Sequence, residues 1–212
     1  MNLPNKLTVS RLALTVLFVV AIFWQVPFND TVALLLFITA SLTDVFDGLI
    51  ARRRNLTTNF GILMDPLADK VLICSAFVAL VERHMYAAAA GTLPVAFHIG
   101  QRAIYPKVAA WMVVVIVARE LVITGLRLLA ASKNVVLAAE RYGKHKTFSQ
   151  TVAVIALLTL EAAKEWGSDI LTVLTPWGPA IALIALWGAV TLTAFSGAVY
   201  LWRNRHIYLA ET

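Results

Sequence analysis

Carboxylates gather in one stretch of the chain, residues 44–69, which lies between apolar runs. The stretch holds four of the six aspartates of the sequence, Asp44, Asp47, Asp65 and Asp69. On helices, Asp44 and Asp47 share one face and Asp65 and Asp69 share another, because residues three or four apart are neighbours. Carboxylates packed this closely resist ionisation unless cations lie among them. Divalent ions that prefer oxygen ligands, such as Mg²⁺ or Mn²⁺, meet that need, so the spacing predicts a metal centre.

The helix face that carries Asp44 and Asp47 bears little other side-chain bulk. Gly48 and Ala51 follow on the same face, so a bulky ligand can approach the backbone there. Arg52 ends this face, and its guanidinium is a natural partner for phosphate. We therefore expect a phosphate-bearing ligand beside the predicted metal centre.

The elements that must position these residues are apolar. The chain has 212 residues, of which 60% are hydrophobic and 14% charged, and its mean hydropathy is +0.78. We predict an all-α integral membrane protein with a single domain over residues 1–212, because this composition is too apolar for an ordinary soluble domain. The net charge of +6 favours anionic lipids or phosphates as partners, with no nucleic acid. With one cysteine, Cys74, the chain forms no intramolecular disulfide.

We predict six transmembrane helices. Their expected bounds are residues 12–26, 31–52, 60–81, 108–132, 147–163 and 178–202. Six spans leave both termini on one side, and most Lys and Arg residues of the connections, including the basic connection 133–146, fall on that side. The positive-inside rule then predicts that the termini and the acidic stretch are cytoplasmic. No cleavable signal follows the first apolar run, so a bacterial inner membrane is the expected location.

The second and third predicted helices are each apolar in one half and acidic in the other. Their apolar parts, residues 32–42 and 71–81, each span about 16 Å at the helical rise, roughly half of the hydrocarbon thickness. Because a short connection makes the two helices a hairpin, the acidic halves should lie at similar depth and face each other. The sequence therefore predicts a polar active-site cavity just below the cytoplasmic surface. Pro66 either kinks the third helix or begins it with Asp65 as the cap.

The acidic stretch resembles the signature of the CDP-alcohol phosphatidyltransferase family, D-x-x-D-G-x-x-A-R followed by G-x-x-x-D-x-x-x-D. Its fixed positions are matched by Asp44, Asp47, Gly48, Ala51, Arg52, Gly61, Asp65 and Asp69. The resemblance extends over the chain, because the family core is likewise six helices. It implies an enzyme, often a homodimer, that displaces CMP from a CDP-linked lipid with an alcohol hydroxyl.

The resemblance also implies roles for these residues. Two Mg²⁺ or Mn²⁺ ions would be held by Asp44, Asp47, Asp65 and Asp69, and Asp69 would act as general base on the incoming hydroxyl. The CDP site would be lined by Asp44, Gly48, Ala51 and Arg52. Residues 2–11 resemble the start of bacterial phosphatidylglycerophosphate synthases, a branch of the family, and Asn5 and Thr8 would help to close the nucleotide site. Two metal ions can neutralise a diphosphate in an in-line displacement.

Residues 118–120 and 143–147 resemble the same branch. Its acceptor, glycerol 3-phosphate, is a small dianion, and a pocket for it needs cations. The expected ligands of its phosphate are Arg119, Lys146, Lys144 and Arg127. Arg119 and Arg127 lie two turns apart on the fourth predicted helix, where an unpaired Arg is costly.

Some of these cations have alternative roles. Arg127 follows Glu120 by seven residues, on nearly the same helix face, so pairing with that carboxylate fits the spacing as well as phosphate binding does. Lys144 equally fits a topology or lipid-headgroup charge. Lys70, beside Asp69, is either a counter-charge for the acidic cluster, which we favour, or a phosphate contact.

We therefore expect transfer of a phosphatidyl group from CDP-diacylglycerol to the 1-hydroxyl of glycerol 3-phosphate. The nearest alternative is a transferase of the same family with another acceptor, such as inositol phosphate, and the cations favour a phosphorylated acceptor over serine. A divalent-cation transporter would need acidic residues along a permeation path, whereas these cluster toward one side and no internal repeat is visible. A non-catalytic scaffold leaves the acidic cluster unexplained.

Overall fold

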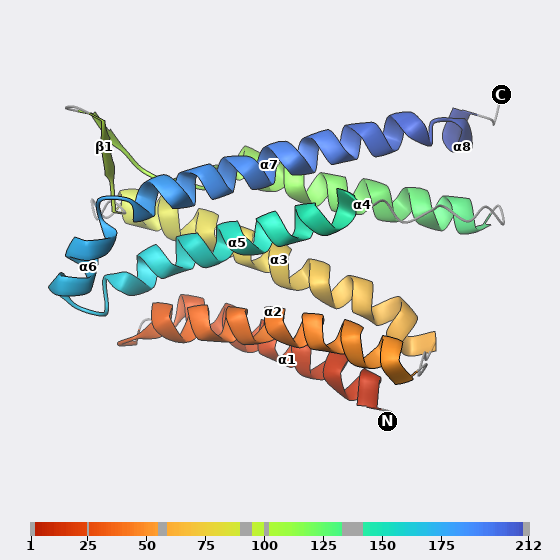
Figure 1. Ribbon diagram of the computed structural model, residues 1–212, viewed down its shortest axis with the longest axis horizontal. Helices are drawn as coiled ribbons and strands as arrows, with labels where there is room; N and C mark the ends of the chain where they lie inside the picture. Colours follow the sequence, from red (N-terminus) through yellow and green to blue (C-terminus); the bar gives the residue numbers. More distant parts are fainter. Residues whose placement is uncertain are drawn as a thin grey trace.

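The protein is mostly helical, and its long helices run along one common axis (Figure 1). The computed structural model describes residues 3–24, 26–54, 59–89, 95–99, 102–132 and 142–209. Within these ranges the helices longer than 20 residues are α1 (Leu3–Phe23), α2 (Asn29–Arg54), α3 (Asn59–Ala89), α4 (Ala110–Ser132), α5 (Tyr142–Ala163) and α7 (Gly178–Arg203). Each predicted span overlaps one of these helices, with different bounds, so six long helices lie where the sequence predicted six membrane spans.

Short elements join the long helices, and the sequence did not predict them. Strands β1 (Phe97–Ile99) and β2 (Arg102–Ile104) pair antiparallel, and α6 (Ser168–Leu174) and α8 (His206–Leu209) are short helices. The strands and α6 lie at one end of the bundle, where α1 ends and α2 begins, and we call this the strand end (Figure 1). At the other end α2 finishes and α3 begins, and we call this the motif end.

Pro66 lies inside α3, which begins seven residues earlier at Asn59. It does not begin the helix, and Asp65 is not a cap. A proline in a helix interior removes one backbone hydrogen bond. The irregular point of the predicted third helix is therefore an internal proline.

The long helices bury one continuous apolar cluster. It includes at least one fully buried side chain from each of them, for example Phe18, Phe37, Phe77, Ile116, Leu158 and Leu186. Helix α1 packs against both α2 and α3, α2 also packs against α5, and α7 packs against α4 and α5. In the described part of the chain, α2 and α3 contact each other much less than each contacts α1.

One of the described helices, α7, is long and apolar enough to cross a membrane, judged by length and composition. Shorter apolar stretches, Val9–Phe23 and Asn29–Thr43, lie within α1 and α2. In α2 the apolar stretch stops at Thr43 because the acidic motif begins at the next residue.

At the strand end, Arg83 of α3 and Glu165 hold the beginning of α2. The guanidinium of Arg83 donates to both carboxylate oxygens of Asp30, at 2.6 and 2.5 Å, and to the carbonyl oxygen of Ile22 at 3.1 Å. Glu165 accepts the backbone N–H groups of Asp30 and Thr31 at 3.0 and 2.9 Å, and the Thr31 hydroxyl at 2.6 Å. Its carboxylate thus satisfies N–H groups that have no partner within the helix.

A second group at the strand end joins α3, α4 and α5. The buried carboxylate of Glu161 accepts Lys164 Nζ at 2.6 Å and lies 3.7 Å from His84 Nε2. His84 Nδ1 accepts the backbone N–H of Val108 at 3.1 Å. These contacts connect the residues just before α4 to the ends of α3 and α5.

Candidate active site

The acidic motif lies on two helices that adjoin at the motif end. The backbone is helical at Asp44 and Asp47 in α2 and at Asp65 and Asp69 in α3. The predicted spacing therefore puts each pair on one helix face. The side chains of residues 44–54, 59–67 and 69 lie outside the described part of the structure. The ligand geometry of the four aspartates stays a prediction.

Other predicted site residues also lie on described helices while their side chains lie outside the described part of the structure. Gly48, Ala51 and Arg52 lie on the last turns of α2, and Asn5 and Thr8 lie on the first turns of α1. Nothing is described of their side chains. Among the side chains that are described, no group of three or more His, Cys, Asp or Glu could hold a metal ion.

Glu120, on α4, is the carboxylate on which two of the predicted phosphate ligands converge. It is buried and accepts hydrogen bonds from Lys146 Nζ and, at 3.3 Å, from Arg119 Nη1. Lys146 comes from α5 and its side chain is only 5% exposed. Breaking such a buried pair by removing one partner is costly, because a charge is left uncompensated. The structure brings Arg119 and Lys146 together at Glu120, and their role as phosphate ligands stays a prediction.

A chain of contacts leads from Glu120 to the motif helix α3. Lys70 Nζ donates to the hydroxyl of Thr124, and this hydroxyl donates to the backbone carbonyl of Glu120 at 2.7 Å. Lys70 directly follows Asp69 along α3. The turn of α4 that carries Glu120 is thus connected to the helix that carries Asp65 and Asp69.

Arg119 also lies against α7. Its Nη2 is 3.5 Å from Ser196 Oγ. A Cβ atom placed on Gly197 would lie 2.7 Å from Arg119 Cγ, which is closer than such atoms approach. Glycine at position 197 therefore permits the stem of Arg119 to lie against the α7 backbone.

The other two predicted phosphate ligands are placed differently. Arg127 lies against Tyr200, with its Nε 3.4 Å from the phenol oxygen and its guanidinium carbon 5.7 Å from the ring centroid. It pairs with Tyr200 and not with Glu120, so the alternative that paired it with this carboxylate is wrong. Lys144 lies on the first turn of α5, and its side chain is outside the described part. The segment that holds Lys144 and Lys146 is helical, whereas the sequence predicted a loop, because polar residues continue the helix beyond its apolar part.

A small cavity lies among these side chains. It is lined by Lys70, Ile73, Cys74, Glu120, Lys146, Thr147 and Gln150 and has a volume of about 10 Å³. This is close to the least room that a water molecule needs. A phosphate enters only if the lining side chains move apart.

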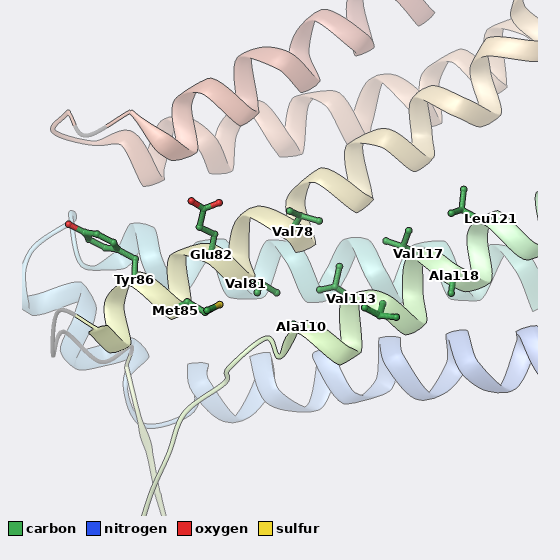
Figure 2. A pocket seen from close by; sticks show the side chains of 11 residues that line it. Val78, Val81, Glu82, Met85, Tyr86, Ala110, Val113, Val117, Ala118 and Leu121 are labelled. Atoms are coloured by element: carbon green, nitrogen blue, oxygen red, sulfur yellow. The ribbon is translucent and has the colours of Figure 1, made fainter.

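A much larger groove, of about 830 Å³, lies between α3 and α4. Figure 2 shows apolar side chains of both helices along it, among them Val78, Val81, Val113 and Val117. Its polar lining residues are Glu82 and Tyr86, and no lining residue is a cation. The lining of this groove therefore offers no cation to hold a phosphate or a nucleotide.

Residues 1–195 match the sequence profile of the CDP-alcohol phosphatidyltransferase family. The chain belongs to this family. Similar members include a CDP-diacylglycerol–glycerol-3-phosphate 3-phosphatidyltransferase of Bacillus subtilis, which is 37% identical, with 96% of this chain and 95% of the relative covered. A protein of the same name from Rickettsia bellii is 32% identical, with coverages of 94% and 93%. A probable phosphatidylglycerophosphate synthase of Mycobacterium tuberculosis is 35% identical, with coverages of 95% and 81%.

Family membership confirms the resemblance carried by the eight motif positions, and it leaves the transporter and scaffold alternatives without support. Arg119 and Lys146 were named from the sequence, whereas Glu120 was named only as a possible partner of Arg127, and Thr124 and Gly197 were not named. One signal was available for Glu120, because a carboxylate inside an apolar helix is rare without a functional partner.

Proposed function

We propose that the protein transfers a phosphatidyl group from CDP-diacylglycerol to the 1-hydroxyl of sn-glycerol 3-phosphate, releasing CMP and forming phosphatidylglycerophosphate. The observation that carries the proposal is the convergence of Arg119 and Lys146 on Glu120, connected through Lys70 to the motif helix α3. Relatives named for this reaction cover most of the chain.

The motif fits two Mg²⁺ or Mn²⁺ ions, because its carboxylates are the hard oxygen ligands that these ions prefer. We assign the ligands as Asp44, Asp47, Asp65 and Asp69, on helices α2 and α3. When bound, the ions neutralise charge on the diphosphate.

The protein's own residues then bind the acceptor, orient it and remove the proton of its hydroxyl group. Arg119 and Lys146 bind the acceptor phosphate, with Lys144 and Arg127 as further cations of the pocket. Asp69 takes the proton of the acceptor hydroxyl. The hydroxyl oxygen forms a bond to the phosphorus of the phosphatidyl group, and the bond from that phosphorus to the bridging oxygen of CMP breaks. CMP leaves with the electron pair, and no covalent enzyme intermediate forms.

The nucleotide site in this proposal lies on α1 and α2. Arg52 pairs with a phosphate of CDP, while Gly48 and Ala51 let the nucleotide approach α2 next to Asp44. Asn5 and Thr8 close the site from α1.

We further propose that residues 1–212 form one membrane domain with six spans in a bacterial inner membrane, with termini and active site facing the cytoplasm. The long helices have 21 to 31 residues, enough at about 1.5 Å per residue to cross the hydrocarbon layer. Large apolar side chains lie outward, among them Leu121, Ile184 and Phe195, which are 68%, 72% and 70% exposed. A lipid surrounding accommodates such faces. The homodimer remains a proposal that rests on the family resemblance.

The test measures CMP release by purified protein in mixed micelles with CDP-diacylglycerol and Mg²⁺. Glycerol 3-phosphate, inositol phosphate and serine are supplied separately, and one sample has no acceptor. We expect release that depends on glycerol 3-phosphate, is lost in Asp69→Asn and is retained in Asp169→Asn, an exposed aspartate of α6. Release with another acceptor alone would keep the chemistry and overturn the acceptor, and folded protein that releases no CMP would overturn the proposal.

A further inference from the structure

We infer that Glu120 is a positioning residue for the acceptor, whose carboxylate holds Lys146 and Arg119 where they bind the phosphate of glycerol 3-phosphate. The inference rests on the proposed function. It assigns to the acceptor pocket a carboxylate, Glu120, that itself repels the phosphate of the substrate. The supporting observations are the contacts made by one turn of α4, residues 119–124.

The first observation is that Glu120 joins cations from two different helices. Arg119 is its neighbour on α4, whereas Lys146 is on α5. The exposed fractions of the three side chains are 10% for Glu120, 11% for Arg119 and 5% for Lys146. A lysine has a long flexible stem, and Glu120 gives its ammonium group a defined location inside the bundle.

The second observation is that this location is defined relative to the motif. The Thr124 hydroxyl donates to the Glu120 carbonyl and accepts from Lys70, the residue after Asp69. Arg119 in turn reaches Ser196 on α7. One turn of α4 therefore contacts α3, α5 and α7, and it connects the acceptor cations to the helix that carries the proposed general base.

The third observation is the charge of the group. A buried carboxylate beside a phosphate site repels the substrate, so its presence needs a compensating purpose. Lys146 and Arg119 both donate to the one carboxylate of Glu120, so this contact joins two cations with a single anion. A phosphate monoester carries close to two negative charges at neutral pH, and we infer that Glu120 sets the place where these cations meet it.

Glu120 and a phosphate can be bound at the same time. An ammonium group has three N–H donors and a guanidinium has five, so Lys146 and Arg119 can each donate to both anions. The cavity beside them, about 10 Å³, is too small for a phosphate until the lining side chains part. Because Glu120 contacts both cations, we expect it to hold Lys146 and Arg119 together while the other lining side chains part.

A purely structural ion pair is the alternative, and the strand end supplies the matched control. Glu161 is also a buried carboxylate on a long helix, and it also has two basic partners, Lys164 and His84. It lies at the opposite end of the bundle from the motif. Its loss should affect stability without any effect on the acceptor.

The experiment compares Glu120→Gln, Glu120→Asp and Glu161→Gln in full-length protein. Steady-state CMP release gives kcat and the KM for each substrate, and thermal unfolding in micelles is followed with and without inorganic phosphate. We expect Glu120→Gln to raise the KM for glycerol 3-phosphate at least tenfold, with the KM for CDP-diacylglycerol changed less than twofold. Glu120→Asp, which keeps the charge but withdraws it by one methylene, should raise the same KM about threefold.

Inorganic phosphate gives a readout that needs no turnover. It should raise the unfolding temperature of the wild type and of Glu161→Gln, but not that of Glu120→Gln. If Glu120→Gln does not fold, Glu120→Asp carries the test with the same direction of change. If the wild type releases no CMP, the proposed function fails, and the phosphate-dependent unfolding temperature still decides the role of Glu120.

The inference is overturned if Glu120→Gln leaves the KM for glycerol 3-phosphate within twofold, or raises both KM values alike. It is also overturned if Glu161→Gln raises the KM for glycerol 3-phosphate as much as Glu120→Gln does. A phosphate-dependent rise in unfolding temperature that persists in Glu120→Gln would have the same consequence.

Discussion

At the strand end, both carboxylate oxygens of Asp30 accept from one guanidinium nitrogen of Arg83, whereas midway along α4 the carboxylate of Glu120 is shared by Lys146 and Arg119. In the first arrangement, one cation serves one carboxylate and also donates to the backbone carbonyl of Ile22. In the second, one carboxylate faces two cations with many donors between them.

We propose that the difference separates a group that holds helices together from a group that binds the acceptor. Glu165 and Arg83 secure the first turn of α2, and Glu161 joins the ends of α3 and α5. The Glu120 group instead connects cations to the helix of the catalytic motif. Substitutions at the two ends should therefore divide between stability and activity.

The largest expected effect on activity follows removal of divalent metal. Chelation by EDTA should lower CMP release roughly a hundredfold or more, because metal stabilisation of transition-state charge is worth several kcal/mol, and added Mg²⁺ should restore it. Hydrogen exchange of the Asp30 and Thr31 amides, which Glu165 accepts at the strand end, should not change. Undiminished release in EDTA would refute the metal assignment, and faster exchange there would break the separation of the two ends.

Lys146→Gln should raise the KM for glycerol 3-phosphate roughly 10- to 100-fold, as expected for the loss of a hydrogen bond to a charged group. Lys164→Gln is the matched change at the strand end. The Lys164 side chain is 35% exposed beside Glu161, so this variant should leave both KM values unchanged and cost less than about 1 kcal/mol of unfolding free energy. Equal effects of the two variants on the KM would contradict the comparison.

Gly197→Ala should raise the KM for glycerol 3-phosphate about fivefold, because the new methyl group displaces Arg119 and small displacements are costly in a site. Gly188→Ala, on the same helix, is the control, since a Cβ there meets nothing within 4 Å. Kinetics of the two variants, measured side by side, check this. An unchanged KM in Gly197→Ala would show that the packing of Arg119 against α7 does not affect binding of the acceptor.

The smallest expected effect on activity belongs to Asp30→Asn. This substitution removes the charge that Arg83 meets, and it should lower the free energy of unfolding by about 1–3 kcal/mol. For each folded molecule, kcat and both KM values should stay as in the wild type. Denaturant unfolding in micelles measures the loss, and Asp169→Asn should change the unfolding free energy by less than about 0.5 kcal/mol, because Asp169 is exposed.

The long helices and the location of the motif could be predicted from the sequence, because apolar runs of sufficient length are read directly. The first residue of each helix was harder to predict from the sequence. The predicted fifth helix begins at residue 147, whereas α5 begins at Tyr142, since a polar turn with Lys144 and Lys146 is helical without being apolar. Strands of three residues, such as β1 and β2, carry too few side chains to show a period.

Contacts between helices could not be predicted from the sequence. The seven-residue spacing fitted a pairing of Arg127 with Glu120 as well as phosphate binding, but Arg127 contacts Tyr200 of α7. Lys146 reaches Glu120 from α5, and spacing along one chain does not reveal a meeting of two helices. The candidate ligands could thus be named from sequence, while the carboxylate that unites them required the structure.

The single cysteine of the chain, Cys74, lines the same small cavity as Lys70, Glu120 and Lys146. A fluorescent or spin label can therefore be directed to this place without replacing any other thiol. The wild-type sequence already carries a built-in attachment point for a reporter beside the acceptor pocket. Occupancy of that pocket then becomes observable in real time, independently of product formation.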